Sequence, residues 1–263
     1  LGKIREIEGK EIPHWYPKDR MMHASEDQEC WGVKWRAGTS NFRTVDELFT
    51  KRNLWALAAI KGVVLLYDNL LSLLWTAGIL PASKMNGIVG GILAGTYYLP
   101  QVFQENNVLD SLQRRFNSII DEYPMPIRTG QVIISTDNAT TLLPLTTSSV
   151  DYVFTDPPYA GKIQYGELNF VWEAWLGFDT HWHDEEIVVN EVRGKTEEDW
   201  ANMMRQAMAE CYRVLKPGRA ISLCYHDTSE GTWALVQDIM AEAGFLVEKS
   251  DSAIFIDKSH KSF

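Results

Sequence analysis

From about Thr129 onward, short apolar runs alternate with longer amphipathic stretches. Short runs rich in β-branched and aromatic residues predict buried strands, and apolar positions every three to four residues predict helices. The predicted strands cover residues 131–135, 150–156 and 219–225, and the predicted helices cover 196–215 and 231–243, before a hairpin-like pair near 246 and 254. Strands that alternate with helices are typical of a parallel, doubly wound sheet.

The first half of the chain has a helical pattern instead. A helix is predicted to start at Thr44, because Thr44 and Glu47 have the spacing of a capping box. Its apolar pattern continues to about Leu74, with a break near Gly62. Such a long apolar stretch favours a place inside a helical layer.

These two patterns predict an α/β protein with two regions. Residues 1–128 form an N-terminal irregular and helical region, which is irregular over 1–43 and ends with a helix over 108–123. Residues 129–263 form a partial doubly wound, Rossmann-like sheet.

The apolar segment 63–80 has the length of a membrane span. Asp68 lies inside it, however, and a carboxylate in hydrocarbon costs a few kcal/mol. We therefore expect a buried core helix and no membrane partner.

The tetrapeptide Asp156-Pro157-Pro158-Tyr159 follows the apolar run 150–154 and is the strongest indication of chemistry in the sequence. An exocyclic amine such as adenine N6 is a poor nucleophile, because its lone pair is delocalised into the ring. The Asp156 carboxylate and the Pro157 carbonyl can accept the two amino hydrogens and draw the nitrogen toward tetrahedral geometry. The Tyr159 ring can stack on the base, which is worth about 1–3 kcal/mol.

A rigid turn after a strand is the alternative interpretation of the tetrapeptide, since Asp and Pro are frequent turn residues. The preceding apolar run favours the chemical interpretation, because ligand crevices lie at the carboxyl ends of parallel strands. Attack on a sulfonium methyl group then requires positioning more than a metal or a covalent nucleophile. The tetrapeptide thus predicts methyl transfer to the exocyclic amine of a flipped nucleobase.

With the tetrapeptide and the segment Gln164-Tyr165-Gly166-Glu167-Leu168, the chain resembles the amino-methyltransferase superfamily, and more narrowly the prokaryotic adenine-specific DNA methylase-like proteins. Further matching segments are residues 15–17, 49–54, 95–100, 186–190, 193–195 and 213–218. The resemblance implies S-adenosylmethionine as cofactor and DNA, or RNA, as substrate. Adenine N6 is the implied target, with cytosine N4 as a close alternative.

The resemblance also implies which residues contact the cofactor. In the family, a polar residue after the preceding strand contacts the cofactor adenine, which makes Asp137 and Asn138 candidates beside Asp156. An Asx turn that caps the next helix is the alternative for Asp137 and Asn138.

Substrate contacts are expected from Tyr159, from Gln164 and Tyr165, which lie nearest the turn, and from His226. His226 follows a predicted strand, where a helix-capping role is the alternative. The long connection 160–195 is rich in aromatic residues that could clamp a flipped base, although most of its rings are expected to pack in the core.

One expected feature is missing from the sequence. The superfamily holds the methionine part of its cofactor with a D-x-F-x-G-x-G loop, and no such run exists here. The glycine-rich run 86–95 follows no predicted strand and is a weak substitute. We expect the loop on a segment upstream of Leu1 or on a second subunit. A catalytically silent module that serves in nucleic-acid binding or assembly is the second hypothesis.

The net charge of −10 counts against a nucleic-acid substrate, because phosphate contacts leave a basic surface. A separate recognition domain or subunit could supply that surface. Three cysteines without paired spacing indicate a reducing, cytoplasmic compartment. The cluster His181-Trp182-His183-Asp184-Glu185 matches no established metal-site spacing, so no metal is expected.

Overall fold

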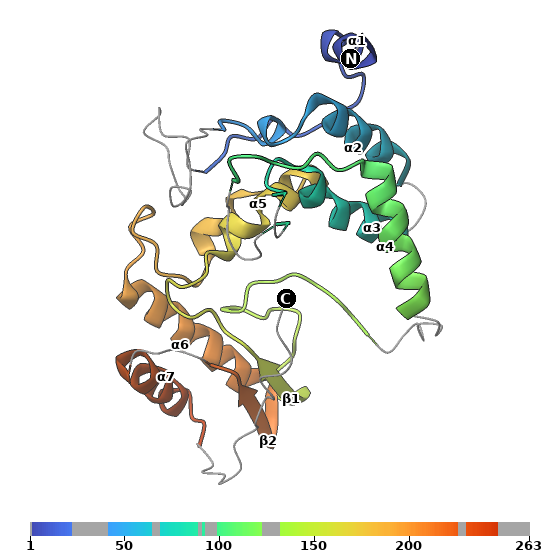
Figure 1. Ribbon diagram of the computed structural model, residues 1–263. Coiled ribbons are helices and arrows are strands. Elements are labelled where there is room, and N and C mark those ends of the chain that lie inside the picture. Colours follow the sequence, from blue (N-terminus) through green and yellow to red (C-terminus); the bar gives the residue numbers. More distant parts are fainter. Residues whose placement is uncertain are drawn as a thin grey trace. The chain divides into compact units, whose positions relative to one another are not determined.

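The apolar run before Asp156 forms β1 (Val150–Thr155), close to the predicted strand. The structure, a computed structural model, is shown in Figure 1. It describes residues 2–22, 42–64, 69–88, 91–92, 99–122, 132–225 and 230–246. β1 pairs in parallel with β2 (Leu215–Leu223), and Thr155 lies opposite Leu223. The protein is therefore of the α/β class, and the two strands form a two-stranded sheet within the described residues.

The chain divides into two compact units. Residues 1–128 and 165–185 form the first unit, and residues 129–164 and 186–263 form the second. The segment 165–185 lies in the C-terminal half of the sequence, yet it packs with the N-terminal helices. The reason is α5 (Tyr165–Leu176), whose apolar side chains are buried in the core of the first unit.

The first unit is helical. Its other elements, where η denotes a 3-10 helix, are α1 (Gly2–Gly9), η1 (Val45–Leu48), α2 (Lys51–Val64), α3 (Asn69–Ile79), η2 (Leu80–Ala82), α4 (Val108–Glu122) and η3 (His181–Glu185). Three buried aromatic residues centre its core. Trp175 meets Trp75 edge to face, with ring centroids 5.8 Å apart, and meets Phe49 at 5.5 Å. Among the helices of the described ranges, none is long and apolar enough to cross a bilayer.

The predicted helix start at Thr44 is wrong. The structure gives the Thr44 side chain no capping hydrogen bond to a described residue, and only a short 3-10 turn follows it. The Glu47 carboxylate accepts from the backbone N–H of Arg43 at 2.7 Å instead. Phe49 is extended and forms a bridge with Ser83, which interrupts the helical pattern, so α2 begins only at Lys51. A tertiary contact has overridden the local capping pattern.

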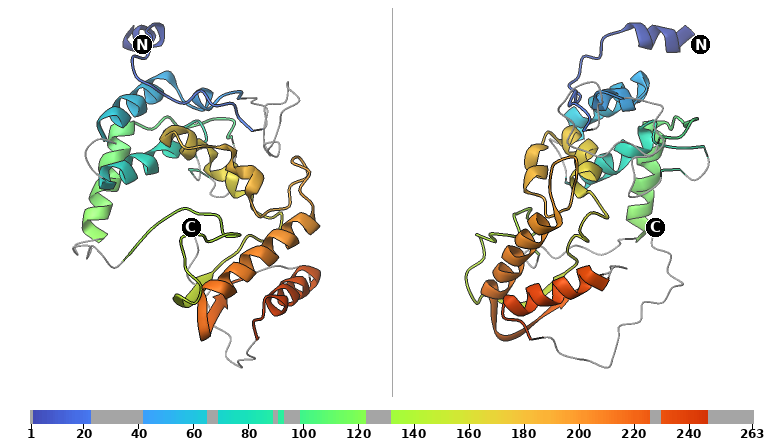
Figure 2. Two further views of the ribbon diagram at one scale, coloured as in Figure 1. Left: turned by 180° about the vertical axis from the view of Figure 1, so that it is seen from behind. Right: turned by 90° about the vertical axis from the view of Figure 1, so that its left-hand side faces the viewer.

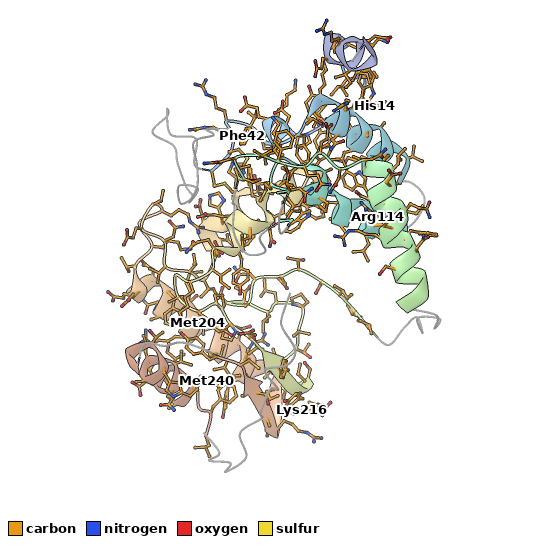
Figure 3. All side chains as sticks on the ribbon, in the orientation of Figure 1. His14, Phe42, Arg114, Met204, Lys216 and Met240 are labelled. Carbon is orange, nitrogen blue, oxygen red and sulfur yellow. The ribbon has the colours of Figure 1, made fainter. Side chains whose placement is uncertain are left out.

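In the second unit, α6 (Glu197–Val214) and α7 (Glu230–Glu242) run side by side (Figure 2). Their buried faces include Met204 of α6 and Met240 of α7, which are labelled in Figure 3. Ile221 and Leu223 of β2 pack against the same cluster. A helical layer therefore covers one face of the sheet, as expected for a parallel strand–helix–strand unit.

The predicted strand at 131–135 is absent. Its described residues, 132–135, have no regular secondary structure, and the side chains of Ile133 and Ile134 are 96% and 92% exposed. The sequence supplied β-forming residues, but a strand also needs a hydrogen-bonded neighbour. β1 and β2 pair with each other, and neither pairs with this segment in the described structure.

β2 begins earlier than predicted, at Leu215 rather than Arg219. Leu215 is already extended as it caps α6, so the helix leads directly into the strand. Pro217 and Gly218 lie inside the strand, where the register with β1 shifts between Val150 and Tyr152. Gly218 has φ +71°, a conformation that favours glycine. Proline is tolerated at such irregular points of a ladder.

α6 starts where the sequence predicts, on a capping box. The Thr196 hydroxyl accepts from the backbone N–H of Asp199 at 3.2 Å, and the Asp199 carboxylate accepts from the backbone N–H of Thr196 at 2.8 Å. The backbone hydrogen bond from Thr196, followed by the bond from its hydroxyl, lowers the pKa of Asp199 below its ordinary value.

Thr196→Ala is expected to destabilise the protein by about 1 kcal/mol, because the backbone N–H of Asp199 loses its side-chain acceptor. Thr196→Ser keeps the acceptor and serves as the matched control. Urea unfolding at neutral pH measures both variants. Equal stability of the alanine and serine variants would show that the cap contributes nothing.

Candidate active site

The predicted catalytic carboxylate lies at the carboxyl end of β1. The ladder continues past the strand through the backbone N–H of Cys224, which donates to the Thr155 carbonyl at 2.8 Å. Asp156 follows directly and is exposed. Its Oδ1 accepts a short hydrogen bond from the Tyr159 hydroxyl. A carboxylate offers about four acceptor positions, so this bond leaves Asp156 able to accept from a further donor.

The two prolines differ in what their carbonyls do. The Pro158 carbonyl accepts from the indole N–H of Trp200 at 3.3 Å and from the backbone N–H of Ala160 at 3.1 Å. Ala160 has φ +49°, which is uncommon for a residue with a side chain. No donor among the described residues bonds to the Pro157 carbonyl. The turn thus fixes its second carbonyl internally, whereas Pro157 itself is buried, unlike the exposed Asp156 beside it.

The ring of Tyr159 is held by neighbouring aromatic residues. It meets Tyr225, which follows β2, edge to face at 5.1 Å. Tyr225 in turn stacks on Trp233 of α7 at 6.0 Å. Tyr159 is therefore half-buried and oriented from two directions, by Tyr225 at its ring and by Asp156 at its hydroxyl.

Asp137 and Asn138 form the Asx-type turn that the sequence allows as the alternative to cofactor contact. The Asn138 Oδ1 accepts from the backbone N–H and the hydroxyl of Thr140, at 2.9 and 2.7 Å. The Asp137 carboxylate accepts from the backbone N–H of Asn138 at 2.8 Å. Turns rather than a helix follow, so this turn caps no helix. Cofactor contact by either residue stays a prediction.

The three predicted substrate residues beyond the tetrapeptide fall in different places. Gln164 belongs to the second unit and is half-buried. Tyr165 begins α5, belongs to the first unit and is 39% exposed. His226 lies outside the described residues, as does the predicted hairpin partner near 254.

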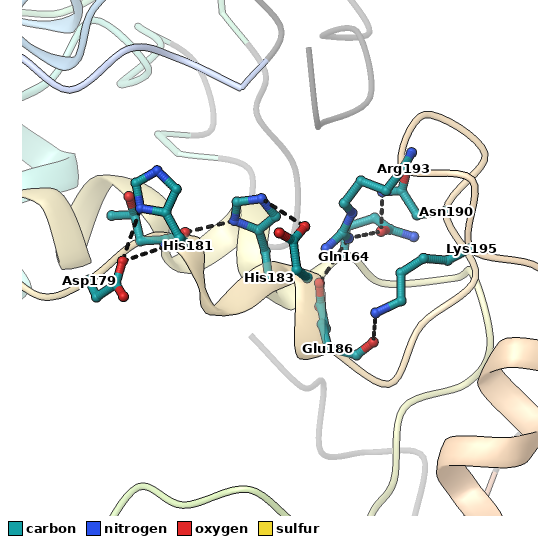
Figure 4. A network of polar contacts seen from close by, with 10 residues as sticks. Gln164, Asp179, His181, His183, Glu186, Asn190, Arg193 and Lys195 are labelled. Atoms are coloured by element: carbon teal, nitrogen blue, oxygen red, sulfur yellow. Dashed lines mark hydrogen bonds and ion pairs between the residues drawn. The ribbon is translucent and has the colours of Figure 1, made fainter. Parts of the chain in front are cut away.

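The Gln164 side chain is held within the second unit (Figure 4). Its Oε1 accepts from Asn190 Nδ2 at 2.8 Å and from Arg193 Nη2 at 3.0 Å. Its Nε2 donates to the Val189 carbonyl at 2.9 Å and to the Gly161 carbonyl at 3.3 Å. All four hydrogen-bonding positions of the amide are thus used inside the protein.

A buried ion pair that is not predicted from the sequence completes this network. Arg193 Nη2 donates to the Glu186 carboxylate at 2.9 Å, and both side chains are only 4% exposed. Lys195 donates to the backbone carbonyl of Glu186. Buried Glu and Arg side chains are rare unless paired. The sequence spacing of Glu186 and Arg193 could therefore have suggested a pair, but not its connection to Gln164.

The histidine cluster has local partners. His183 is buried, and its Nδ1 lies 2.7 Å from the Thr180 carbonyl. The exposed His181 lies 3.0 Å from the Asp179 carboxylate. Within the described residues, no group of His, Cys, Asp and Glu side chains could hold a metal ion.

Comparisons with known proteins give no match: no family model, curated protein or solved structure resembles the chain closely enough to count. The chemistry must therefore be inferred from the site alone.

Proposed function

We propose that the protein transfers a methyl group from S-adenosylmethionine to the exocyclic amine of an extruded nucleobase, with adenine N6 in DNA as the target and cytosine N4 as the close alternative. One observation carries the proposal. An exposed carboxylate, Asp156, lies at the carboxyl end of a parallel strand, hydrogen-bonded to a tyrosine whose ring can stack on a base. Ligands of α/β proteins bind at this end of the strands.

Each residue of the tetrapeptide has a separate task in this chemistry. Asp156 accepts one amino hydrogen, and the Pro157 carbonyl accepts the other, which raises the electron density on the nitrogen. The Trp200 indole N–H donates to the Pro158 carbonyl and so fixes the backbone that follows Asp156 and Pro157. The Tyr159 hydroxyl orients the carboxylate, while its ring offers a face to the base.

S-adenosylmethionine supplies an electrophilic methyl group when it is bound. Asp156 and Asp137 are exposed carboxylates that could accept hydrogen bonds from the cofactor. The fit is partial, because Asn138 is engaged in its own turn and no glycine loop follows a strand in the described ranges. We propose that a further segment, upstream or on a second subunit, completes a doubly wound, Rossmann-like sheet and contributes that loop.

A second candidate function is a methyltransferase-fold module that serves in nucleic-acid binding or assembly without catalysis. It is favoured by the sheet face that carries Tyr152 and Phe154, which are 53% and 67% exposed. Because parallel sheets are normally covered on both faces, this exposed face favours packing against a partner. Calorimetry with S-adenosylmethionine tests the first candidate: binding at micromolar affinity supports the enzyme, and no binding by this chain supports either a fragment that lacks its glycine loop or the silent module.

We place the activity in the cytoplasm, because Cys211 and Cys224 are both free thiols. A DNA substrate would further need a basic surface. Because the chain has a net charge of −10, we propose that a partner supplies that surface.

Tyr159→Ala is expected to weaken binding of single-stranded DNA by about 5- to 150-fold, which corresponds to the 1–3 kcal/mol of one stacked base. Tyr159→Phe keeps the ring, so its affinity should stay near that of the wild type. Fluorescence anisotropy with a labelled oligonucleotide measures both variants. Equal losses in the two variants would argue against stacking and for a role of the hydroxyl alone.

A further inference from the structure

Hydrogen bonds hold the backbone that follows Asp156 at three points within the second unit. Trp200 of α6 donates to the Pro158 carbonyl at 3.3 Å, and the backbone N–H of Val189 donates to the Ala160 carbonyl at 3.2 Å. The third point is Gln164, whose amide bonds to the carbonyls of both Gly161 and Val189. The turn after the tetrapeptide is thereby tied to residues about 25 positions further along the chain.

Gly161 shows how closely these segments approach. A Cβ atom at this position would lie 3.2 Å from the Val189 carbonyl oxygen, which is tighter than ordinary contact. The same carbonyl accepts from Gln164. The close approach of Gly161 and the hydrogen bond from Gln164 therefore both involve the Val189 carbonyl.

The Glu186–Arg193 pair explains why the Gln164 amide has a single orientation. Arg193 donates through Nη2 to both the Glu186 carboxylate and Gln164 Oε1, at 2.9 and 3.0 Å. Asn190 donates to the same oxygen and accepts from the backbone N–H of Arg193. With its oxygen fixed by these two donors, the Gln164 NH₂ group must face the two backbone carbonyls.

Burying an ion pair rarely adds stability over an apolar pair of the same size, because both ions lose their hydration. The Glu186–Arg193 pair is nevertheless almost completely buried. Structural specificity is the better-attested use of such pairs, and here the pair fixes one amide against one turn.

We propose that Gln164, Arg193 and Glu186 form a positioning clamp, which holds the turn after Asp156 in the geometry needed to grip an amine. This role rests on the proposed methyl transfer. It gives Gln164 a task distinct from the substrate contact expected from the sequence, since its hydrogen-bonding positions are already filled. A misplacement of about 1 Å in such a site can cost about 10²-fold in rate.

The test combines one measurement of the turn with one of the reaction. Gln164→Met keeps the length of the side chain and removes all its hydrogen bonds. Arg193→Lys keeps the charge beside Glu186 but lacks the planar, forked donor group, and so provides a second variant if the first folds poorly. Arg205→Ala is the matched control, because Arg205 pairs with Glu242 at the exposed surface of α6 and α7.

Hydrogen–deuterium exchange tests, independently of activity, whether the clamp residues hold the turn. Backbone amides of residues 159–164 are expected to exchange about tenfold faster in both clamp variants than in the wild type and in Arg205→Ala. Wild-type exchange rates in both clamp variants would overturn the clamp, whether or not the protein transfers methyl groups.

Steady-state kinetics then separates positioning from substrate contact. Positioning predicts that kcat falls by about 10- to 100-fold in Gln164→Met while KM for DNA changes less than about threefold. A rise in KM with unchanged kcat would overturn the positioning role and would support direct contact between Gln164 and the substrate. Absence of methyl transfer by the wild type would contradict the proposed function, and the exchange rates would still decide the clamp.

Discussion

Asp156→Ala is expected to lower kcat for methyl transfer by about 10²- to 10³-fold, the loss that follows removal of one preorganised polar partner of the reacting group. The carboxylate is exposed at the tip of β1 and accepts a hydrogen bond from the Tyr159 hydroxyl. The substitution therefore removes an acceptor and little packing. Transfer of labelled methyl groups to DNA, followed over time, measures the effect.

Two further variants sharpen this result. Asp156→Asn keeps one acceptor oxygen and is expected to retain more activity than Asp156→Ala. Asp238→Ala removes an exposed carboxylate of α7 that belongs to no part of the proposed site, and should leave the rate unchanged. An Asp156→Ala variant as fast as the wild type would remove this carboxylate from the mechanism.

Trp175→Ala is expected to destabilise the first unit by about 3–5 kcal/mol, the usual cost of truncating a large buried aromatic side chain. Trp175 is fully buried, and its ring contacts both Trp75 and Phe49. Typical domains have only about 5–15 kcal/mol of stability. The variant should therefore unfold at a much lower urea concentration than the wild type.

Trp175→Phe provides the control for this prediction. It keeps an aromatic ring between Phe49 and Trp75 and removes an indole N–H that bonds to no acceptor among the described residues. Its cost should be clearly smaller than that of alanine. A loss below about 1 kcal/mol for Trp175→Ala would show that this aromatic cluster does not centre the core.

The predictable parts of the fold were those specified by local sequence. β1 follows from one apolar run, and the helical pattern that starts at Thr196 predicts α6, to which the structure adds a capping box. The failures at Thr44 and at 131–135 have the opposite cause. Phe49 is extended through its bridge to Ser83, and the β-forming residues 132–134 lie outside the sheet. At Phe49 a tertiary contact decides the structure, and at 132–134 the lack of a pairing strand does; no local pattern records either.

The candidate site divides in the same way. Asp156 and Tyr159 could be placed together from sequence because they are three residues apart, and the structure joins them by a hydrogen bond. Gln164 and Arg193 are separated by 29 positions, so their contact depends on how the chain returns to the turn. The sequence identified Gln164 as a residue of interest but gave no indication of its partners.

In the proposed reaction, a carboxylate and a neighbouring carbonyl at the tip of β1 accept the two hydrogens of an exocyclic amine. The most direct test incubates the protein and DNA with S-adenosylmethionine carrying a labelled methyl group, and then identifies the labelled nucleoside after complete digestion. We predict N6-methyladenine, with N4-methylcytosine as the only other acceptable product. Label on a ring carbon or on the sugar, or no labelled nucleoside at all, would contradict the proposed reaction.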